Sequence, residues 1–245
     1  MKIGIQLYTI RDVIGGDPQA ALDKIARAGY DGVEFAGYFD WKADRLKAAL
    51  DAAGLVACGS HVPYELLAEH TDEQIEYAKT LGLGNFTIPY LDVKSLLDPE
   101  ILKTIPRIAE KAEKAGIKLC YHNHYHEFKN KTDGRFVMDA FYDALPGVYA
   151  ELDTYWATDG GADPIAYMEK LGKRLANIHI KDMKKDPAER KVNANIGEGI
   201  LPVAEIVRKA QAMGLGWAIV EMDACDGDPI ECVTASRANL RKMGF

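Results

Sequence analysis

The sequence predicts an α/β fold in which eight parallel strands, each followed by a helix, close into a (β/α)8 barrel. One pattern recurs along all 245 residues: an amphipathic helical stretch, a glycine, and a short β-branched or apolar run that ends in polar residues. Eight such units fit the length with little left over, as expected for a barrel of about 250 residues. No G-x-G-x-x-G follows the first run, which weakens the alternative of an open dinucleotide-binding sheet.

The expected strands and helices each have local signals. The strand runs begin near Lys2, Gly32, Leu55, Asn85, Ile117, Val148, Leu175 and Trp217. Helix starts are marked by a capping aspartate before a proline, a residue suited to the first helical position. These pairs are Asp17-Pro18, Asp98-Pro99, Asp163-Pro164 and Asp228-Pro229. Helical runs end at a glycine, which accepts the positive φ of a helix C-terminus. These glycines are Gly29, Gly54, Gly82, Gly116 and Gly214.

We expect residues 1–245 to form a single TIM-barrel domain, because eight βα units leave almost no room for an accessory domain. The connections are short except after the seventh strand run. There, residues 184–201 form a long, charged, glycine-containing loop. A long loop at that place is a candidate substrate lid.

Composition excludes several classes of protein. The chain is 48% hydrophobic and 27% charged, which is typical of a soluble globular protein. Its net charge of -7 means that there is no overall positive charge to attract the phosphates of a nucleic acid, so we expect no nucleic-acid partner. No run approaches the roughly 18 apolar residues of a membrane span, so we expect no membrane partner. Four cysteines without CxxC pairing favour a reducing cytoplasm. The sequence leaves a homo-oligomer open.

Polar residues gather where the later strand runs end. Alternate residues of a barrel strand point inward, and the C-terminal strand ends form the mouth. The inward polar residues of the last four runs are His122, His124, Glu151, Asp153, Asn177, His179, Lys181, Glu221 and Asp223; Gln6, Tyr8, Glu34 and His61 add to the other side. Because barrel interiors are normally filled by Val, Ile and Leu, this cluster indicates a functional site.

Converging carboxylates and an imidazole form the mixed oxygen and nitrogen ligand set of a divalent metal. We expect one such ion, with Asp153, His179 and Glu221 as ligands. Mn²⁺ is the first expectation, and Mg²⁺, Co²⁺ and Zn²⁺ are alternatives. A fourth ligand comes from the segment YHNHYHEF. It is either Glu127, reaching back from the loop, which we favour, or His122 at the strand end.

The chain resembles the xylose isomerase-like barrels, a family of sugar phosphate isomerases/epimerases that includes inosose dehydratases, ketose 3-epimerases and hydroxypyruvate isomerases. The likeness spans nearly the whole chain, through GIQLYTIRD, GYDGVEF, YHNHYHEF, ELDTYWA, NIHIKDM, NIGEGILPV and VEMD. It implies one divalent metal held by Glu, Asp, His and Glu at the strand ends. Residue by residue, this pattern matches Asp153, His179 and Glu221.

Two positions depart from the ketose 3-epimerases of this family. Trp156 stands where those enzymes have a sugar-binding histidine, and His122 stands where they have a glutamate base. The HNHxxEF arrangement resembles instead a branch that acts on 3-keto sugars and glycosides.

We expect a metal-dependent sugar isomerase or epimerase that acts on a small carbohydrate through a metal-stabilised enediolate. Glu221 or His124 is the expected base for the proton α to the carbonyl, and Lys181 is expected to hydrogen-bond a substrate oxygen. The expected substrate-binding residues are Tyr8, His61, His122, Trp156 and Lys181. The alternative is a lyase, hydratase or glycoside-cleaving enzyme that acts on a 3-keto sugar by proton abstraction and elimination. A non-catalytic carbohydrate-binding protein is a third class, disfavoured because the ligand set is intact.

Several of these residues also have structural interpretations. His61 is equally well explained as a hydrogen-bonded structural histidine, and Trp156 as core packing. Lys181 and Asp182 are alternatively an ion pair at the rim of the barrel. Asp182 is otherwise expected to anchor the loop at the strand end.

Overall fold

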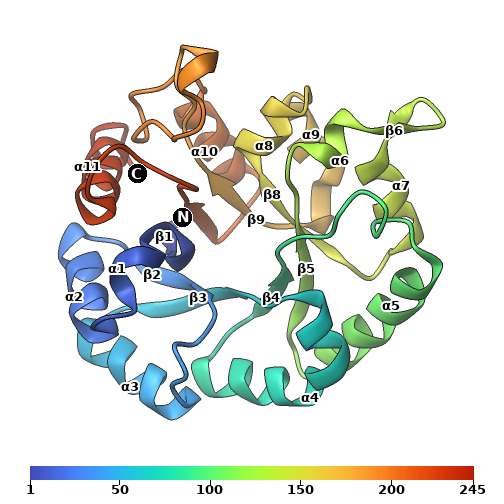
Figure 1. The fold of residues 1–245 in the computed structure, drawn as a ribbon, viewed down its shortest axis with the longest axis horizontal. Helices are drawn as coiled ribbons and strands as arrows, with labels where there is room; N and C mark the ends of the chain where they lie inside the picture. Colours follow the sequence, from blue (N-terminus) through green and yellow to red (C-terminus); the bar gives the residue numbers. More distant parts are fainter. The chain divides into compact units, whose positions relative to one another are not determined.

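A computed structural model describes all 245 residues (Figure 1). The strand order is that of a closed barrel, β1-β10-β9-β8-β5-β4-β3-β2, which confirms the predicted fold class. The barrel strands are β1 (Lys2–Gln6), β2 (Gly32–Ala36), β3 (Val56–His61), β4 (Asn85–Ile88), β5 (Lys118–His122), β8 (Tyr149–Asp153), β9 (Leu175–Ile180) and β10 (Trp217–Val220). Every strand begins within one residue of the predicted position.

The chain divides into two compact units. The first comprises Met1–Cys58 and Asn177–Phe245, and the second comprises Gly59–Ala176. The expectation of a single domain over residues 1–245 stays a prediction.

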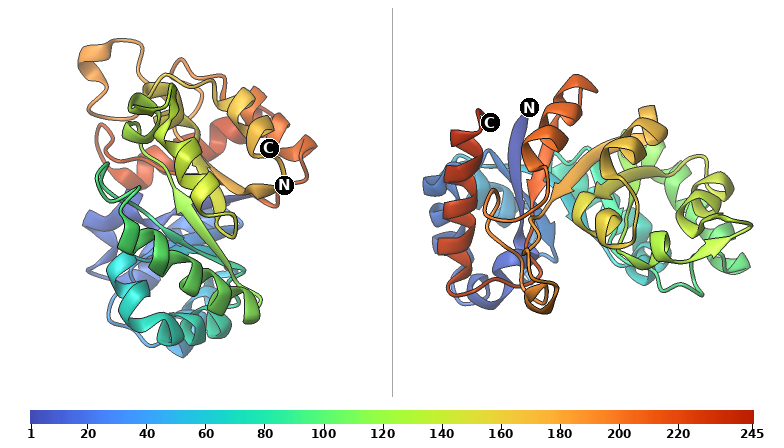
Figure 2. Two further views of the ribbon diagram at one scale, coloured as in Figure 1. Left: turned by 90° about the vertical axis from the view of Figure 1, so that its right-hand side faces the viewer. Right: turned by 90° about the horizontal axis from the view of Figure 1, so that it is seen from above.

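In the first unit, β1 pairs with both β2 and β10, and β10 pairs with β9. Its helical elements are η1 (Leu7–Ile10), α1 (Arg11–Ile14), α2 (Pro18–Ala28), α3 (Ala43–Ala53), η3 (Pro187–Glu189), α10 (Val203–Ala212) and α11 (Pro229–Lys242). Helix α2 packs against both α3 and α11 (Figures 1 and 2). The register places Gln6 beside Glu34, and His179 beside Ile219.

In the second unit, β4 pairs with β3 and β5, and β5 pairs with β8. Its helical elements are α4 (Tyr64–Leu81), α5 (Pro99–Lys114), α6 (His126–Lys129), α7 (Val137–Ala144), α8 (Thr154–Asp159), α9 (Pro164–Leu171) and η2 (Gly172–Arg174). A short hairpin, β6 (Lys131–Thr132) and β7 (Arg135–Phe136), was not predicted. The register places His122 beside Glu151.

The predicted helix boundaries follow from local chemistry. Each of the four Asp-Pro aspartates accepts a backbone N–H in the first turn of its helix. The five glycines that were expected to end helical runs all adopt positive φ. No helix of the structure has both the length and the apolar character that crossing a membrane requires.

Apolar side chains fill the space between strands and helices. Phe35, Ile178, Ile180 and Val220 are fully buried strand residues. The polar residues that alternate with them are just as deeply buried, among them Glu34 and His179, both 0% exposed. Because burying polar groups is costly unless they are paired, their partners decide what the site can do.

Candidate functional site

In the first unit, a chain of hydrogen bonds joins buried polar groups on four neighbouring strands. Gln6 Nε2 donates to Glu34 Oε2 over 2.8 Å, and the same oxygen lies 2.7 Å from His179 Nε2. On the other side of the ring, His179 Nδ1 lies 2.8 Å from Glu221 Oε2. One imidazole is therefore held between two carboxylates away from solvent.

Lys181 extends this chain. Its Nζ lies 3.0 Å from Glu221 Oε2 and donates to Asp223 Oδ2 over 2.8 Å, although the side chain is only 1% exposed. A buried ammonium requires such pairing. Asp182 does not pair with Lys181, so the alternative of a rim ion pair is wrong. The expectation that Asp182 anchors the strand-end loop is confirmed, because its carboxylate accepts backbone N–H groups of that loop.

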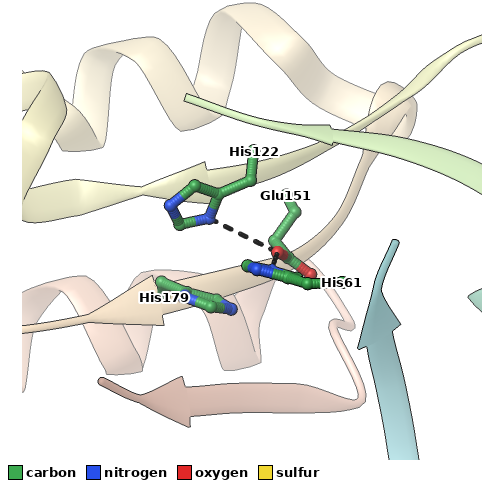
Figure 3. A group of neighbouring side chains, drawn as sticks. All are labelled: His61, His122, Glu151 and His179. Atoms are coloured by element: carbon green, nitrogen blue, oxygen red, sulfur yellow. Dashed lines mark hydrogen bonds and ion pairs between the residues drawn. The ribbon is translucent and has the colours of Figure 1, made fainter. Parts of the chain in front are cut away.

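Glu151 is the centre of the corresponding group in the second unit. Its Oε1 lies 2.6 Å from His61 Nε2 and 3.4 Å from His122 Nδ1. Figure 3 shows both imidazoles directed at the Glu151 carboxylate. Thr87 Oγ1 donates to the other oxygen, Oε2, over 3.2 Å. His61 is thus hydrogen-bonded through Nε2, as its structural interpretation requires.

Asp153 stands at the end of β8 and also caps α8. Its Oδ1 accepts the Trp156 N–H over 2.8 Å, and its Oδ2 lies 3.8 Å from His122 Nε2. Asn123 fixes the Asp153 backbone in both directions: Asn123 Oδ1 accepts the Asp153 N–H, and Asn123 Nδ2 donates to the Asp153 carbonyl. Sequence reasoning missed Asn123, and its position between two inward histidines in YHNHY was the available signal.

Glu127 is held within its own loop. Its Oε1 accepts the Tyr121 hydroxyl over 2.6 Å, and its Oε2 accepts the His124 N–H over 3.0 Å. The carboxylate is fully buried, and this burial raises the pKa of Glu127. Both oxygens therefore have protein donors from the segment YHNHYHEF.

The remaining predicted residues, His124, Trp156 and Tyr8, make ring contacts. The His124 ring stacks on Trp156 with centroids 5.7 Å apart, and Tyr90 meets His124 edge-on at 5.2 Å. Tyr8 is 43% exposed, and the Arg11 guanidinium covers its ring at 4.1 Å. Arg11 also donates to the carbonyls of Tyr8 and Asp223, which ties Tyr8 to the end of β10.

Both units thus carry, at the ends of their strands, buried imidazole and carboxylate groups of the kind that could hold a metal ion. Glu34 and Glu151 are the residues whose importance sequence reasoning missed. Strand alternation places both on the inward side, but it assigns them no role. The missing signal is chemical: a histidine that ligates a metal usually gives its other ring nitrogen to a carboxylate.

The chain belongs to the xylose isomerase-like TIM barrel family, whose model matches residues 22–243. An inosose dehydratase from Clostridium beijerinckii is 22% identical, over 93% of this chain and 90% of the relative. A solved sugar phosphate isomerase/epimerase from Parabacteroides distasonis has a TM-score of 0.82 at 23% identity and covers 99% of this chain and 98% of its own. D-Psicose 3-epimerase from Clostridium cellulolyticum has a TM-score of 0.73 at 16% identity, with 100% and 98% covered.

The resemblance predicted from the sequence is therefore confirmed, and the homologues of this chain are enzymes. The family includes isomerases, epimerases and dehydratases. Identities this low establish the shared fold and leave the reaction to the residues of the site.

The buried Glu127 predicts a pH-dependent stability difference. Because burial raises its folded-state pKa, its contribution is fully present below the unfolded pKa and is lost as pH rises through the folded pKa. The free energy of unfolding of wild type, relative to Glu127→Gln, should therefore fall as the pH rises above about 4, the ordinary pKa of a glutamate. Urea unfolding at several pH values measures this difference.

Glu110→Gln is the matched control, because the Lys114 hydrogen bond lowers the pKa of the exposed Glu110. Its difference from wild type should change in the opposite direction. Equal slopes for both variants would contradict the assigned environment of Glu127.

Proposed function

We propose that the chain is a divalent-metal-dependent sugar isomerase or epimerase that acts on a keto sugar or sugar derivative through an enediolate. The observation that carries the proposal is a set of four buried groups at the C-terminal ends of consecutive barrel strands: His122, Asp153, His179 and Glu221. In barrels of this kind the C-terminal strand ends form one mouth, where ligands bind.

The donor atoms of each unit fit a metal. His179 Nδ1 and Glu221 Oε2 are 2.8 Å apart, and His122 Nε2 and Asp153 Oδ2 are 3.8 Å apart. Ligands at bond lengths of about 2.0–2.1 Å lie about 2.8–4 Å from one another. Two carboxylates also offset the charge of a divalent ion. We assign these four residues as its ligands.

The positions of Glu34 and Glu151, on the far side of each imidazole ring from the proposed ion, support this assignment. Glu34 faces the far nitrogen of His179, and Glu151 faces the far nitrogen of His122. A carboxylate in that position fixes the ring and raises its basicity as a ligand. Glu34 hydrogen-bonds its ring at 2.7 Å, whereas Glu151 lies 3.4 Å from His122 Nδ1, at ion-pair distance. A carboxylate beside each ring favours His122 over Glu127 as the fourth ligand, since both Glu127 oxygens accept hydrogen bonds from their own loop.

Two imidazoles and two carboxylates suit Mn²⁺, Co²⁺ or Zn²⁺ better than Mg²⁺, which prefers oxygen ligands. We retain Mn²⁺ as the proposed ion. We also retain a reducing cytoplasm as the proposed location; all four cysteines are free thiols. We also retain homo-oligomer formation as a proposal.

When bound, the ion would supply positive charge to a substrate carbonyl oxygen as an enediolate develops. The chain's own groups hold and move the protons. Glu221 is the proposed base for the proton α to the carbonyl, with His124 as the alternative. Lys181 Nζ, held 3.0 Å from Glu221 Oε2, is the proposed donor to a substrate oxygen. Tyr8, His61 and Trp156 stay proposed as substrate contacts.

A dehydratase is the second candidate, because a full-length relative is an inosose dehydratase and because His122 and Trp156 depart from the 3-epimerase pattern. Elimination shares the same proton abstraction and differs in the loss of a β-hydroxyl group. We propose the Lys181 ammonium as the acid that protonates that leaving group.

Mn²⁺ titration tests the ligand set. We expect one ion per chain, with affinity about 10- to 100-fold weaker in Glu34→Gln because the ring of His179 loses its carboxylate partner. Glu127→Gln should bind Mn²⁺ like wild type. Loss of affinity in Glu127→Gln with wild-type affinity in Glu34→Gln would show that Glu127 is the ligand and Glu34 is not a support.

Incubation in D2O with Mn²⁺, followed by NMR, tests the reaction. The substrates are D-fructose, D-tagatose, D-psicose and 2-keto-myo-inositol. Deuterium should enter at the carbon α to the carbonyl, and should be lost without metal and in Glu221→Gln. An isomer or epimer as product identifies the first candidate, and a product lighter by one water identifies the dehydratase.

The exposed Glu113→Gln variant should behave like wild type in the same experiment. Turnover that continues after metal removal, with no deuterium in the product, would rule out the enediolate scheme.

A further inference from the structure

The loop between β9 and α10 is tied down at its base by a single carboxylate. Asp182, 1% exposed, accepts four backbone N–H groups: Oδ2 takes those of Gly197 and Gly199 at 2.8 and 3.0 Å, and Oδ1 takes those of Met183 and Leu201 at 2.8 and 3.1 Å. The two ends of the loop are thereby joined to one side chain. The outer part, around η3, projects from the unit (Figure 2, left, orange).

Gly199 makes this arrangement possible. A Cβ atom at this position would lie 2.2 Å from Asp182 Oδ1 and 2.5 Å from the Met183 carbonyl oxygen. Only glycine lets the backbone approach the carboxylate so closely. The motif NIGEG therefore forms half of the cradle around Asp182.

The same aspartate places Asn193. The Asp182 carbonyl accepts the Ala194 N–H over 3.1 Å, which fixes the loop where Asn193 meets the end of β10. Asn193 then pairs in both directions with that segment: its N–H donates to the Ala224 carbonyl over 2.7 Å, and its Oδ1 accepts the Asp223 N–H over 2.8 Å. Asn193 is only 5% exposed, so these bonds are shielded from water.

Asp223 connects this pairing to the polar chain of the first unit. Its Oδ2 accepts from Lys181 Nζ over 2.8 Å, and Lys181 in turn lies 3.0 Å from Glu221 Oε2. The position of the Asp223 backbone therefore sets where the Lys181 ammonium sits. Besides its hydrogen bond with Asn193, the Asp223 backbone accepts one from the Arg11 guanidinium at its carbonyl oxygen.

We propose that Asn193 is a positioning residue that holds Asp223, and through it Lys181, in place, while Asp182 keeps the loop base fixed so that Asn193 stays in position. The base of the loop then keeps a fixed position beside the site. The outer segment borders a cleft of about 750 Å³ lined by Lys184, Asp186, Glu189 and Asp226 among others. This inference rests on the proposed function, because it assumes that Lys181 acts on the substrate.

The test compares Asn193→Ala, Asn193→Asp and Asn195→Ala. Alanine removes the acceptor for the Asp223 N–H, whereas aspartate keeps it. Asn195 lies on the same loop, and its side chain donates to that of Glu198, so its variant is the matched control. Three quantities are measured: amide hydrogen exchange at Asp223, Mn²⁺ affinity, and kcat and KM for whichever keto sugar wild type converts.

For Asn193→Ala we expect exchange at Asp223 to accelerate about tenfold. We expect kcat to fall about 10- to 100-fold, with Mn²⁺ affinity unchanged, because only the lysine moves. Asn193→Asp should recover most of both losses, and Asn195→Ala should match wild type. Wild-type kcat in Asn193→Ala, or an equal loss in Asn195→Ala, would overturn the proposal.

The two hypotheses fail in different ways. If wild type converts none of the keto sugars, the proposed function fails, and the exchange measurement alone decides the positioning role. Unchanged exchange at Asp223 in Asn193→Ala would then overturn it, and accelerated exchange restored by aspartate would support it.

Discussion

A buried carboxylate stands behind each of two buried histidines, and the rest of the site depends on this pairing. Glu34 hydrogen-bonds His179 on one side while Glu221 faces the other, and Glu151 lies 3.4 Å from His122 Nδ1. Neither the rings nor the carboxylates could be buried alone without a large desolvation cost. His179 has one nitrogen hydrogen-bonded to Glu34 and the other facing Glu221, while His122 has one nitrogen at ion-pair distance from Glu151 and the other facing Asp153. A carboxylate beside the far nitrogen is common for histidines that bind a metal.

The register of neighbouring strands brings these partners side by side. Gln6 lies beside Glu34 on neighbouring strands, and Gln6 Nε2 bonds the same Glu34 oxygen that faces His179. His122 and Glu151 are register partners on β5 and β8. A slip of one residue in either pair would turn one partner toward the helices. The barrel thus fixes both the rings and their supports before any ligand binds.

Much of this was predictable from the sequence, because the deciding signals are local. Asp-Pro pairs and helix-ending glycines set the element boundaries, and strand alternation placed His179, Lys181 and Glu221 on the inward side. The hydrogen bonding of Glu127 could not be predicted, since it depends on the short α6 turn and on the Tyr121 hydroxyl. The partner of Lys181 was also missed: Asp182 is adjacent in sequence, but its side chain turns to backbone groups 15 to 19 residues further along.

Length and charge predicted a lid in residues 184–201, and they carry no information about how such a loop is anchored. Asp182 was expected to anchor the loop, but the residues that it and Asn193 contact, such as Gly199 and Asp223, are distant in sequence and could not be predicted. A loop with four hydrogen bonds to one buried carboxylate at its base is better suited to hold groups in place than to open and close. Its contribution is then to the position of Lys181, beside the residues proposed to act on the substrate.

Electron spin echo envelope modulation of the Mn²⁺-loaded protein tests the two-histidine site most directly, because it counts the imidazole nitrogens bound to the ion. Wild type should show two coupled ¹⁴N nuclei, and His122→Gln and His179→Gln should each show one. A single coupling in wild type that persists in His122→Gln would contradict the proposed site and would return Glu127 to the ligand set.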